Sequence, residues 1–364
     1  MAAEEGSENS VPNNVAATLE PACPEARSLY SQEYVELKRL VKQRGLMERQ
    51  SAYYARLMLL TLVLLGLSLL LLVAIDNLWL QLLNAAFLAF VFTQIGFIGH
   101  DIGHRQTMRE SWHNIVAGLI FGNLLIGISR GWWVEKHNQH HGHPNQIDMD
   151  PDIDFPFLAF SEEQARDTRG LGRMIVRHQA YWLLPLFCAS AFSLHGHSVR
   201  YLLEGRTKYR FVEISLLIVH YVWYLLLPFY LLGFWPALLF VVINKATFGL
   251  YMALVFAPNH KGMPVLSASD ELDFMRQQVL TSRNVRPGLI TDYLYGGLNY
   301  QIEHHLFPGI PRNRLRQARE IVRAMCQRCG IDYYETTSLQ SYREIFNHMH
   351  AVSAPLRAGR VWSD

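Results

Sequence analysis

The sequence predicts an all-α integral membrane protein with four transmembrane helices in two hairpins and a helical cap that holds a histidine-rich site. Three observations lead to this prediction. Half of the 364 residues are hydrophobic, and they gather in long runs rather than spreading evenly. Four of these runs form two pairs, each joined by a very short turn. Short histidine motifs lie beside the ends of the runs and in the loop between the two pairs.

Four runs have the length of about 20 apolar residues that a helix needs to cross a bilayer. The expected spans are residues 57–75, 78–99, 211–232 and 236–257. Asp76-Asn77 joins the first pair and residues 233–235 join the second, so each pair forms a helical hairpin. Two shorter apolar runs, 115–128 and 181–194, are expected to be interfacial or re-entrant. His220 and Lys245 are costly inside a bilayer, so we expect them to face the protein interior.

The flanking segments complete the expected organisation. Residues 1–28 lack apolar periodicity and are predicted to be a disordered tail, 29–350 the membrane domain and 351–364 a C-terminal tail. Residues 37–56 indicate a basic amphipathic helix at the membrane surface, with an ordinary solvated helix as the alternative. The two hairpin turns contain no Lys or Arg, and apart from Lys245 inside the fourth span the basic residues lie in the termini and the central loop. This distribution places the termini, the central loop and the histidine motifs in the cytoplasm. The net charge of +2 suggests no nucleic-acid partner.

Histidines in helical register are the main chemical signal. Eight of the 16 histidines and one glutamine lie in four places: His100-Asp101-Ile102-Gly103-His104, His137-Asn138-Gln139-His140-His141, His260, and Gln301-Ile302-Glu303-His304-His305. Offsets of three and four residues put side chains on one face of a helix. Neutral imidazole is the commonest metal ligand in proteins. Packed or capping histidines do not explain three such motifs on one side of a membrane, so a metal site is predicted.

The number of ligands favours two metal ions, because a single zinc ion takes only four. Imidazole ligands suit Fe, Zn, Cu and Ni. Soluble di-iron proteins use paired Glu-x-x-His motifs, but this chain has one match, Glu110 with His113, and no second copy. Asp101, Asn138 and Glu303 lie within the motifs and are candidates for orienting the imidazoles.

The pattern HDIGH, HNQHH and QIEHH, with spans before and between, resembles the membrane fatty acid desaturase family over roughly residues 30 to 350. The resemblance implies two iron ions at the cytoplasmic face. It assigns catalytic roles to His100, His104, His137, His140, His141, His304 and His305. The metal ligands it implies are these seven histidines together with His260 and Gln301. The final motif begins with Gln301, as in front-end desaturases, whereas many members have histidine there. No HPGG heme motif occurs, so a separate electron donor is expected rather than a fused cytochrome b5 domain.

The reaction that the resemblance implies is the introduction of a cis double bond into an acyl chain, with O2 as co-substrate and two electrons from a donor such as a ferredoxin, a rubredoxin-like protein or cytochrome b5. The acyl chain is expected on CoA, a carrier protein or a lipid. The membrane is the inner membrane in a bacterium or the endoplasmic reticulum in a eukaryote. A hydroxylase or ketolase on the same scaffold is the alternative. A metal transporter is a third hypothesis, and the position of the histidines at span ends argues against it.

Two further sets of residues have open interpretations. Six arginines flank the last motif and could meet substrate phosphates or form a solvated basic face: Arg283, Arg286, Arg312, Arg314, Arg316 and Arg319. Four aspartates alternate between Asp148 and Asp154. They lack the glycine and glutamate of a calcium loop, so we expect them to pair with basic residues or cap helices.

Overall fold

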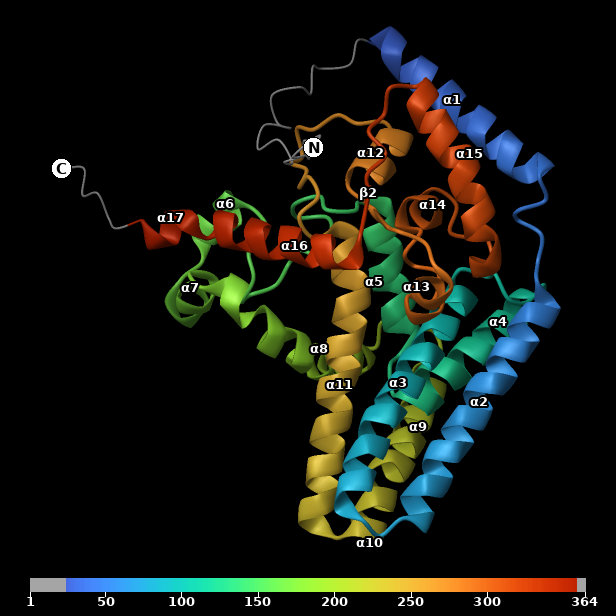
Figure 1. Ribbon diagram of the computed structural model, residues 1–364, viewed down its shortest axis with the longest axis vertical. Coiled ribbons are helices and arrows are strands. Elements are labelled where there is room, and N and C mark those ends of the chain that lie inside the picture. Colours follow the sequence, from blue (N-terminus) through green and yellow to red (C-terminus); the bar gives the residue numbers. More distant parts are fainter. Residues whose placement is uncertain (1–23, 359–364) are drawn as a thin grey trace, which may run out of the picture.

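The computed structural model describes residues 24–358, which are almost entirely helical (Figure 1). The first half comprises α1 (Pro24–Gln43), α2 (Ser51–Ala74), α3 (Leu78–Gly103), α4 (Ser111–Gly118), the π-helix η2 (Leu119–Ile126), α5 (Arg130–Gly142), α6 (Glu162–Asp167), α7 (Gly170–Val176) and α8 (Gln179–Leu203). The second half comprises α9 (Arg210–Tyr221), the π-helix η3 (Val222–Leu226), α10 (Leu227–Leu232), α11 (Phe234–His260), α12 (Phe274–Leu280), α13 (Leu289–Leu294), α14 (Gln301–Leu306), the 3₁₀-helix η4 (Arg312–Arg314), α15 (Leu315–Arg328), α16 (Ser338–Val352) and α17 (Ala354–Arg357). Strands β1 (Asn284–Val285) and β2 (Glu335–Thr336) pair in parallel.

The prediction of four spans in two hairpins is confirmed. Among residues 24–358, four helical segments are long and apolar enough to cross a membrane: α2, α3, the α9–η3–α10 segment and α11. Each matches one of the predicted spans, except that Ile75, the predicted end of the first span, is the residue after α2. Both α3 and α11 continue beyond the predicted ends, to Gly103 and His260, and these additional turns carry histidines toward the cap. The chain is therefore an all-α membrane protein.

Neither of the two short apolar runs forms a straight transmembrane helix among the described residues. Residues 111–126 and α5 are bent by 106° around a break at residues 127–129. Gly127 occupies the break with a φ of +73°, a conformation that glycine adopts easily. The second run lies within α8, which is not among the candidate spans in the described chain. Figure 1 shows α8 running from α7 toward α11.

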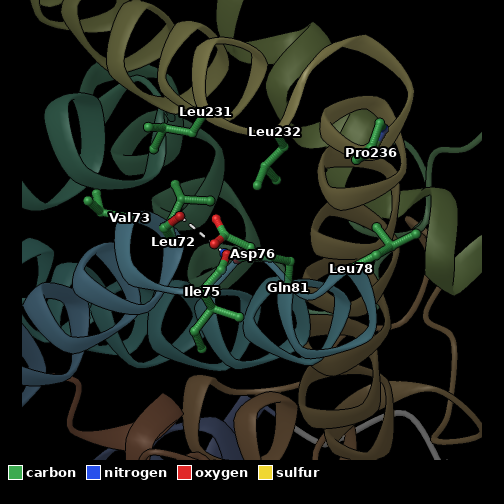
Figure 2. A pocket seen from close by; sticks show the side chains of 9 residues that line it. All are labelled: Leu72, Val73, Ile75, Asp76, Leu78, Gln81, Leu231, Leu232 and Pro236. Carbon is green, nitrogen blue, oxygen red and sulfur yellow. Dashed lines mark hydrogen bonds between the residues drawn. The ribbon is translucent and has the colours of Figure 1, made fainter.

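Polar residues inside the first hairpin join its two helices. The Gln81 amide donates to the carbonyls of Leu71, Leu72 and Ile75 at 3.1, 3.1 and 2.6 Å. Leu71 and Leu72 lie at the end of α2 and Ile75 is its C-cap residue, a position where backbone carbonyls run short of donors within the helix. Asn84 and Ser68 are also hydrogen-bonded, with 2.8 Å from Ser68 Oγ to Asn84 Oδ1. Asp76 of the first hairpin turn and residues that flank both turns line a small cavity of about 200 Å³ (Figure 2).

The prediction of one amphipathic helix over residues 37–56 is wrong. α1 ends at Gln43, Gly45 has a φ of +65°, and α2 begins at Ser51. The apolar face of α1 packs on the cap rather than facing lipid, because Leu37 and Val41 are fully buried in a cluster with residues of α14 and α15. Residues 1–23 of the predicted tail lie outside the described residues, and α1 already begins at Pro24. The domain boundaries stay a prediction.

The charged residue of the fourth predicted span faces the protein interior. Lys245 is buried, and its Nζ lies 2.7 Å from His195 Nε2 on α8 and 4.3 Å from the centre of the Tyr224 ring. His195 Nδ1 contacts the carbonyl of Gly127 at 2.9 Å. His220 is also fully buried, and its Nδ1 lies 3.0 Å from the carbonyl of Leu124. Side chains and backbone carbonyls of the bundle thus make the polar contacts that water would otherwise make with Lys245, His195 and His220.

A glycine sets the crossing of α8 and α11. A Cβ added at Gly249 would lie 2.8–2.9 Å from backbone atoms of Phe187, Cys188 and Ala191. Gly249→Ala is therefore expected to push α8 away from α11 and to destabilise the fold by about 1–3 kcal/mol. The measurement is the midpoint of thermal unfolding in detergent. Gly66→Ala is the control, because a Cβ there has nothing within 4 Å. Equal midpoints for the two variants would contradict this account of the crossing.

Candidate metal centre

All eight predicted histidines converge into two adjacent groups. The first group contains His100, His104, His137, His141 and His304, and the second contains His140, His260 and His305. Within each group, one nitrogen from every ring lies within 4.8 Å of the others. A third arrangement links His140 to Asp150 and Asp152. The three sequence motifs and His260 therefore build one continuous cluster from four separate segments.

The first group lies where the end of α3, the helix α5 and the helix α14 meet. Its Nε2 atoms follow one another at 2.8 Å from His104 to His137, 3.0 Å from His137 to His141 and 3.1 Å from His141 to His304. His304 Nε2 is in turn 3.1 Å from His100 Nε2.

Local packing brings α3 and α5 close enough for this. A Cβ on Gly103 would lie 2.2 Å from the Trp133 ring, which stacks on His137 with 4.5 Å between ring centroids. The glycine of the first motif thus permits the approach of the second.

A buried carboxylate holds the start of α5. Glu213 is fully buried on α9 and accepts hydrogen bonds from Ser129 Oγ at 2.5 Å and from the Gly131 amide at 3.2 Å. Ser129 is the N-cap of α5, and its Oγ accepts from the Trp132 amide at 3.1 Å. A carboxylate near exposed N–H groups at a helix N-terminus is stabilising. Glu213 therefore fixes the helix that carries His137, His140 and His141.

The second group has a donor set that fits a cation. His140 Nδ1 lies 3.0 Å from both carboxylate oxygens of Asp150, and His260 Nδ1 lies 3.0 Å from the carbonyl of Thr281. Because these partners only accept, each Nδ1 carries a proton, and the neutral form of each ring has its lone pair on Nε2. The two Nε2 atoms nevertheless face each other at 3.2 Å. In the neutral forms the two lone pairs repel each other at this distance, and a bound cation would relieve that repulsion.

His305 completes the second group in the same way. Its Nδ1 lies 2.8 Å from Gln278 Oε1, while Gln278 Nε2 donates to the carbonyl of His141 at 3.1 Å, which fixes the amide orientation. His305 Nε2 is buried and has no hydrogen-bond partner in the described structure. Three imidazole lone pairs thus converge without a donor between the rings. This is the arrangement that metal ligands adopt, with the outer ring nitrogen held by an acceptor.

The protonation state suits metal binding. Burial, followed by the neighbouring imidazoles, lowers the pKa of His137, His141, His304 and His305 well below the usual value of 6.5. The pKa of His104 is lowered in the same way. These rings are therefore neutral near pH 7, and only neutral imidazole offers a lone pair to a metal.

Gln301 occupies the edge of the second group. Its side-chain Nε2 lies 2.9 Å from His260 Nε2, and its Oε1 accepts from Asn259 Nδ2 at 3.0 Å. A half-turn of the amide exchanges the donor and the acceptor, so the side chain can present either to this position. Gln301 therefore lies in contact with the second histidine group, as its place in the third motif predicted.

Of the three polar residues predicted to orient the imidazoles, one contacts a ring. Asp101 Oδ1 lies 3.2 Å from His100 Nδ1. Asn138 is exposed, and Glu303 points away from the rings, accepting from Asn284 Nδ2 and Tyr333 OH at 2.7 Å each. Burial raises the pKa of Glu303 to about 7. His113 of the single Glu-x-x-His match is exposed and belongs to neither group.

Sequence reasoning missed the partners that lie outside the motifs. Gln278 and the Thr281 carbonyl come from α12 and the residue after it, far from any histidine motif in sequence. Asp150 belongs to the alternating aspartates, for which pairing with basic residues was expected. It contacts His140, whereas Asp152 does form an ion pair with Lys136. The sequence indicated a contact between Asp150 and His140 only through their separation of ten residues.

Half of the arginines considered for substrate phosphates are already paired within the fold. Arg312 Nε donates to Asp101 Oδ2 at 2.5 Å, behind His100. The Arg283 side chain is fully buried, with Nη1 2.5 Å from Glu344 Oε2. Arg319 forms two hydrogen bonds with Glu335 at 2.6 and 2.8 Å. These three stabilise the cap, which leaves Arg286, Arg314 and Arg316 for any external anion.

An all-α membrane bundle with a buried polyhistidine cluster at one end defines a class of membrane proteins with a metal-binding histidine site. Residues 77–337 match the family model described as fatty acid desaturase. The chain is 30% identical to an acyl-lipid (9-3)-desaturase of Physcomitrium patens over 84% of this chain and 59% of that protein. It is 32% identical to a Delta(6)-fatty-acid desaturase of Caenorhabditis elegans over 74% of this chain and 66% of that protein.

A Delta(8)-fatty-acid desaturase of Euglena gracilis is 33% identical over 69% of this chain and 62% of that protein. The chain belongs to the fatty acid desaturase family, which confirms the resemblance seen in the three motifs. It spans about six tenths of the length of the first of these relatives.

Proposed function

We propose that this chain is an O2-dependent fatty acyl desaturase that introduces a cis double bond into an acyl chain. The observation that carries the proposal is the convergence of eight histidines, five of them buried and three half-buried, into two groups at one end of an apolar bundle. Membership of the desaturase family supports it. An acyl-lipid or acyl-CoA is the proposed substrate, and the acyl-lipid desaturase among the relatives favours the former.

The proposed cofactor is a pair of iron ions. His100, His104, His137, His141 and His304 would hold one ion, and His140, His260 and His305, with Gln301 beside them, would hold the other. Bound iron would supply the redox chemistry with O2 that an unactivated methylene requires, which zinc lacks.

The protein's own residues prepare this site. Asp101, Asp150 and Gln278 accept from the outer ring nitrogens, and so they fix the tautomers that leave Nε2 free. Five of the eight rings are buried, which shields the inner part of the cluster from water. His260 is the last residue of the span α11, so the site lies where an acyl chain can stay in an apolar environment while its polar head remains outside the membrane.

The proposed topology places the cap, both termini and the site in the cytoplasm, as the distribution of basic residues favours. Two electrons would come from a separate donor, a ferredoxin, a rubredoxin-like protein or cytochrome b5.

The test is expression in a host with simple lipids, together with a suitable donor, followed by fatty-acid profiling. A new cis double bond supports the proposal and gives its position. A hydroxylated or oxidised chain would instead establish the hydroxylase or ketolase alternative. Unchanged lipids with folded, iron-loaded protein would rule out the desaturase function.

Metal removal should affect stability and activity differently. Stripping the purified protein with a chelator is expected to lower its thermal midpoint, because the inward lone pairs then face each other without a cation. Adding Zn²⁺ should restore the midpoint but not desaturation, whereas Fe²⁺ should restore both. Recovery of activity with zinc would contradict a redox role for the metal.

Replacing Gln301 tests its place beside the second group. Gln301→Ala is expected to lower activity by roughly 10–100-fold, the usual effect of losing a group that supports a metal site. The exposed Gln139 of the second motif provides the matched control, and Gln139→Ala should retain activity. Metal content and initial rates are measured on both. Full activity of Gln301→Ala would remove Gln301 from the proposed site.

A further inference from the structure

A second apolar surface lies away from the histidine cluster, between α8, α11 and α16. This α8–α16 groove has a volume of about 350 Å³ and is lined by Ala180, Tyr181, Leu183, Leu184, Phe187, Leu254, Tyr342, Ile345 and Phe346. Tyr181 and Leu184 are 63% and 61% exposed, so the groove is open to the outside along α8. Apart from the two tyrosine hydroxyls, its lining side chains offer only carbon. One of these hydroxyls, on Tyr342, donates to the Leu254 carbonyl at 2.7 Å.

The groove lies at the level where a lipid chain is available. Leu254 belongs to the span α11, six residues or about 9 Å along the helix before His260. Figure 1 shows α16 passing across this end of α11, with α8 extending away on the same side. On α7, Leu171 and Met174 are 66% and 68% exposed, as expected for a helix that rests on a membrane surface.

One end of the groove carries positive charge without acidic partners. The Tyr181 ring lies 6.0 Å from the His350 ring, centroid to centroid. Arg357 sits beside them, with Nη2 donating to the His350 carbonyl at 2.5 Å and Nη1 to the Arg177 carbonyl at 3.1 Å. Arg177 is exposed at the junction of α7 and α8. Within residues 24–358, neither arginine forms an ion pair with a carboxylate.

We propose that the α8–α16 groove binds one phospholipid of the surrounding membrane, with an acyl chain in the groove and an anionic headgroup phosphate at Arg177 and Arg357. An apolar channel that ends in guanidinium groups is complementary to an anionic amphiphile. A soluble anion would gain nothing from the apolar lining. A zwitterionic lipid would gain less from the two arginines, because its own ammonium group offsets the charge of its phosphate. This site is separate from the histidine cluster and does not depend on the proposed reaction.

The test uses native mass spectrometry of the full chain in detergent, titrated with phosphatidylglycerol or phosphatidylcholine of the same acyl chains. Wild type is expected to retain one phosphatidylglycerol with at least roughly tenfold preference over phosphatidylcholine. The double variant Arg177→Gln/Arg357→Gln should lose this preference. Leu184→Asn, at an exposed lining position, should weaken retention of both lipids. The control is Arg39→Gln/Arg323→Gln, which removes two exposed charges from α1 and α15 and should bind as wild type.

Thermal midpoints of all variants establish that each is folded, and a folded Arg177→Gln/Arg357→Gln variant that retains phosphatidylglycerol like wild type would overturn the proposal. Equal retention of the two lipids by wild type would also overturn it. Displacement of phosphatidylglycerol by an equimolar amount of oleate would overturn it too, because the groove would then be a fatty-acid site rather than a phospholipid site.

Discussion

His140→Ala is expected to reduce desaturation to background and to remove about one of two bound metal ions. His140 Nε2 faces His260 Nε2 at 3.2 Å, and its Nδ1 is held by Asp150. Its removal takes away one of the three lone pairs of the second group. The expected loss of activity is larger than the roughly 10–100-fold reduction caused by removing a residue that hydrogen-bonds to a metal ligand. Fatty-acid profiling gives the activity, and elemental analysis of the purified protein gives the metal content.

The fold should survive this change. Asp150 remains hydrogen-bonded by the backbone amides of Asn145 and Asp152, each at 2.8 Å, so no carboxylate is left without partners. His143→Ala is the matched control, because His143 lies three residues further along and contacts only the Gln146 side chain through its ring. His143→Ala should keep both metal ions and activity. Full activity in a metal-replete His140→Ala protein would show that His140 is not a ligand.

Arg312→Leu is expected to produce the largest loss of stability, about 3–5 kcal/mol. Arg312 and Asp101 are both buried, and their side chains meet at 2.5 Å. Without the guanidinium, the carboxylate of Asp101 stays buried with an uncompensated charge. Because Asp101 also holds His100 Nδ1 at 3.2 Å, metal retention should fall together with the thermal midpoint.

Two comparisons make the Arg312 prediction specific. Arg314→Leu, two residues away, removes an arginine whose described side-chain partner is Gln317, and it should leave the midpoint unchanged. Adding Asp101→Asn to Arg312→Leu removes the stranded charge and should recover part of the lost stability. If the double variant is as unstable as the sum of the two single changes, the buried ion pair is not the cause.

The spans could be read from the sequence because a bilayer imposes a length and an apolar composition on every crossing helix. The four predicted runs match α2, α3, the α9–η3–α10 segment and α11, with the first run ending one residue beyond α2. The prediction of one amphipathic helix over residues 37–56 was wrong because no comparable constraint acts on that segment. Basic residues spaced among apolar ones suit a membrane surface and a cap equally well, and the left-handed Gly45 and the buried Leu37 decide between them only in three dimensions.

The histidines were found in the sequence because helical spacing is a local property, and their grouping into one cluster follows from the motifs lying at the same end of the bundle. How they divide was not visible. Adjacent His140 and His141 belong to different groups, and so do adjacent His304 and His305, because neighbouring residues on a helix point in directions about 100° apart. Only the packing of α3, α5, α11 and α14 decides which ring each one meets.

The sequence by itself determined the membrane architecture, the eight histidines and the family, since each depends on local composition or on short motifs. The tertiary structure alone decided which groups hold the imidazoles in place. Asp150, Gln278, the Thr281 carbonyl and Arg312 come from segments that carry no recognisable motif. A hydrogen bond across 10 to about 200 residues depends on where the chain returns in space, and no local pattern records that return.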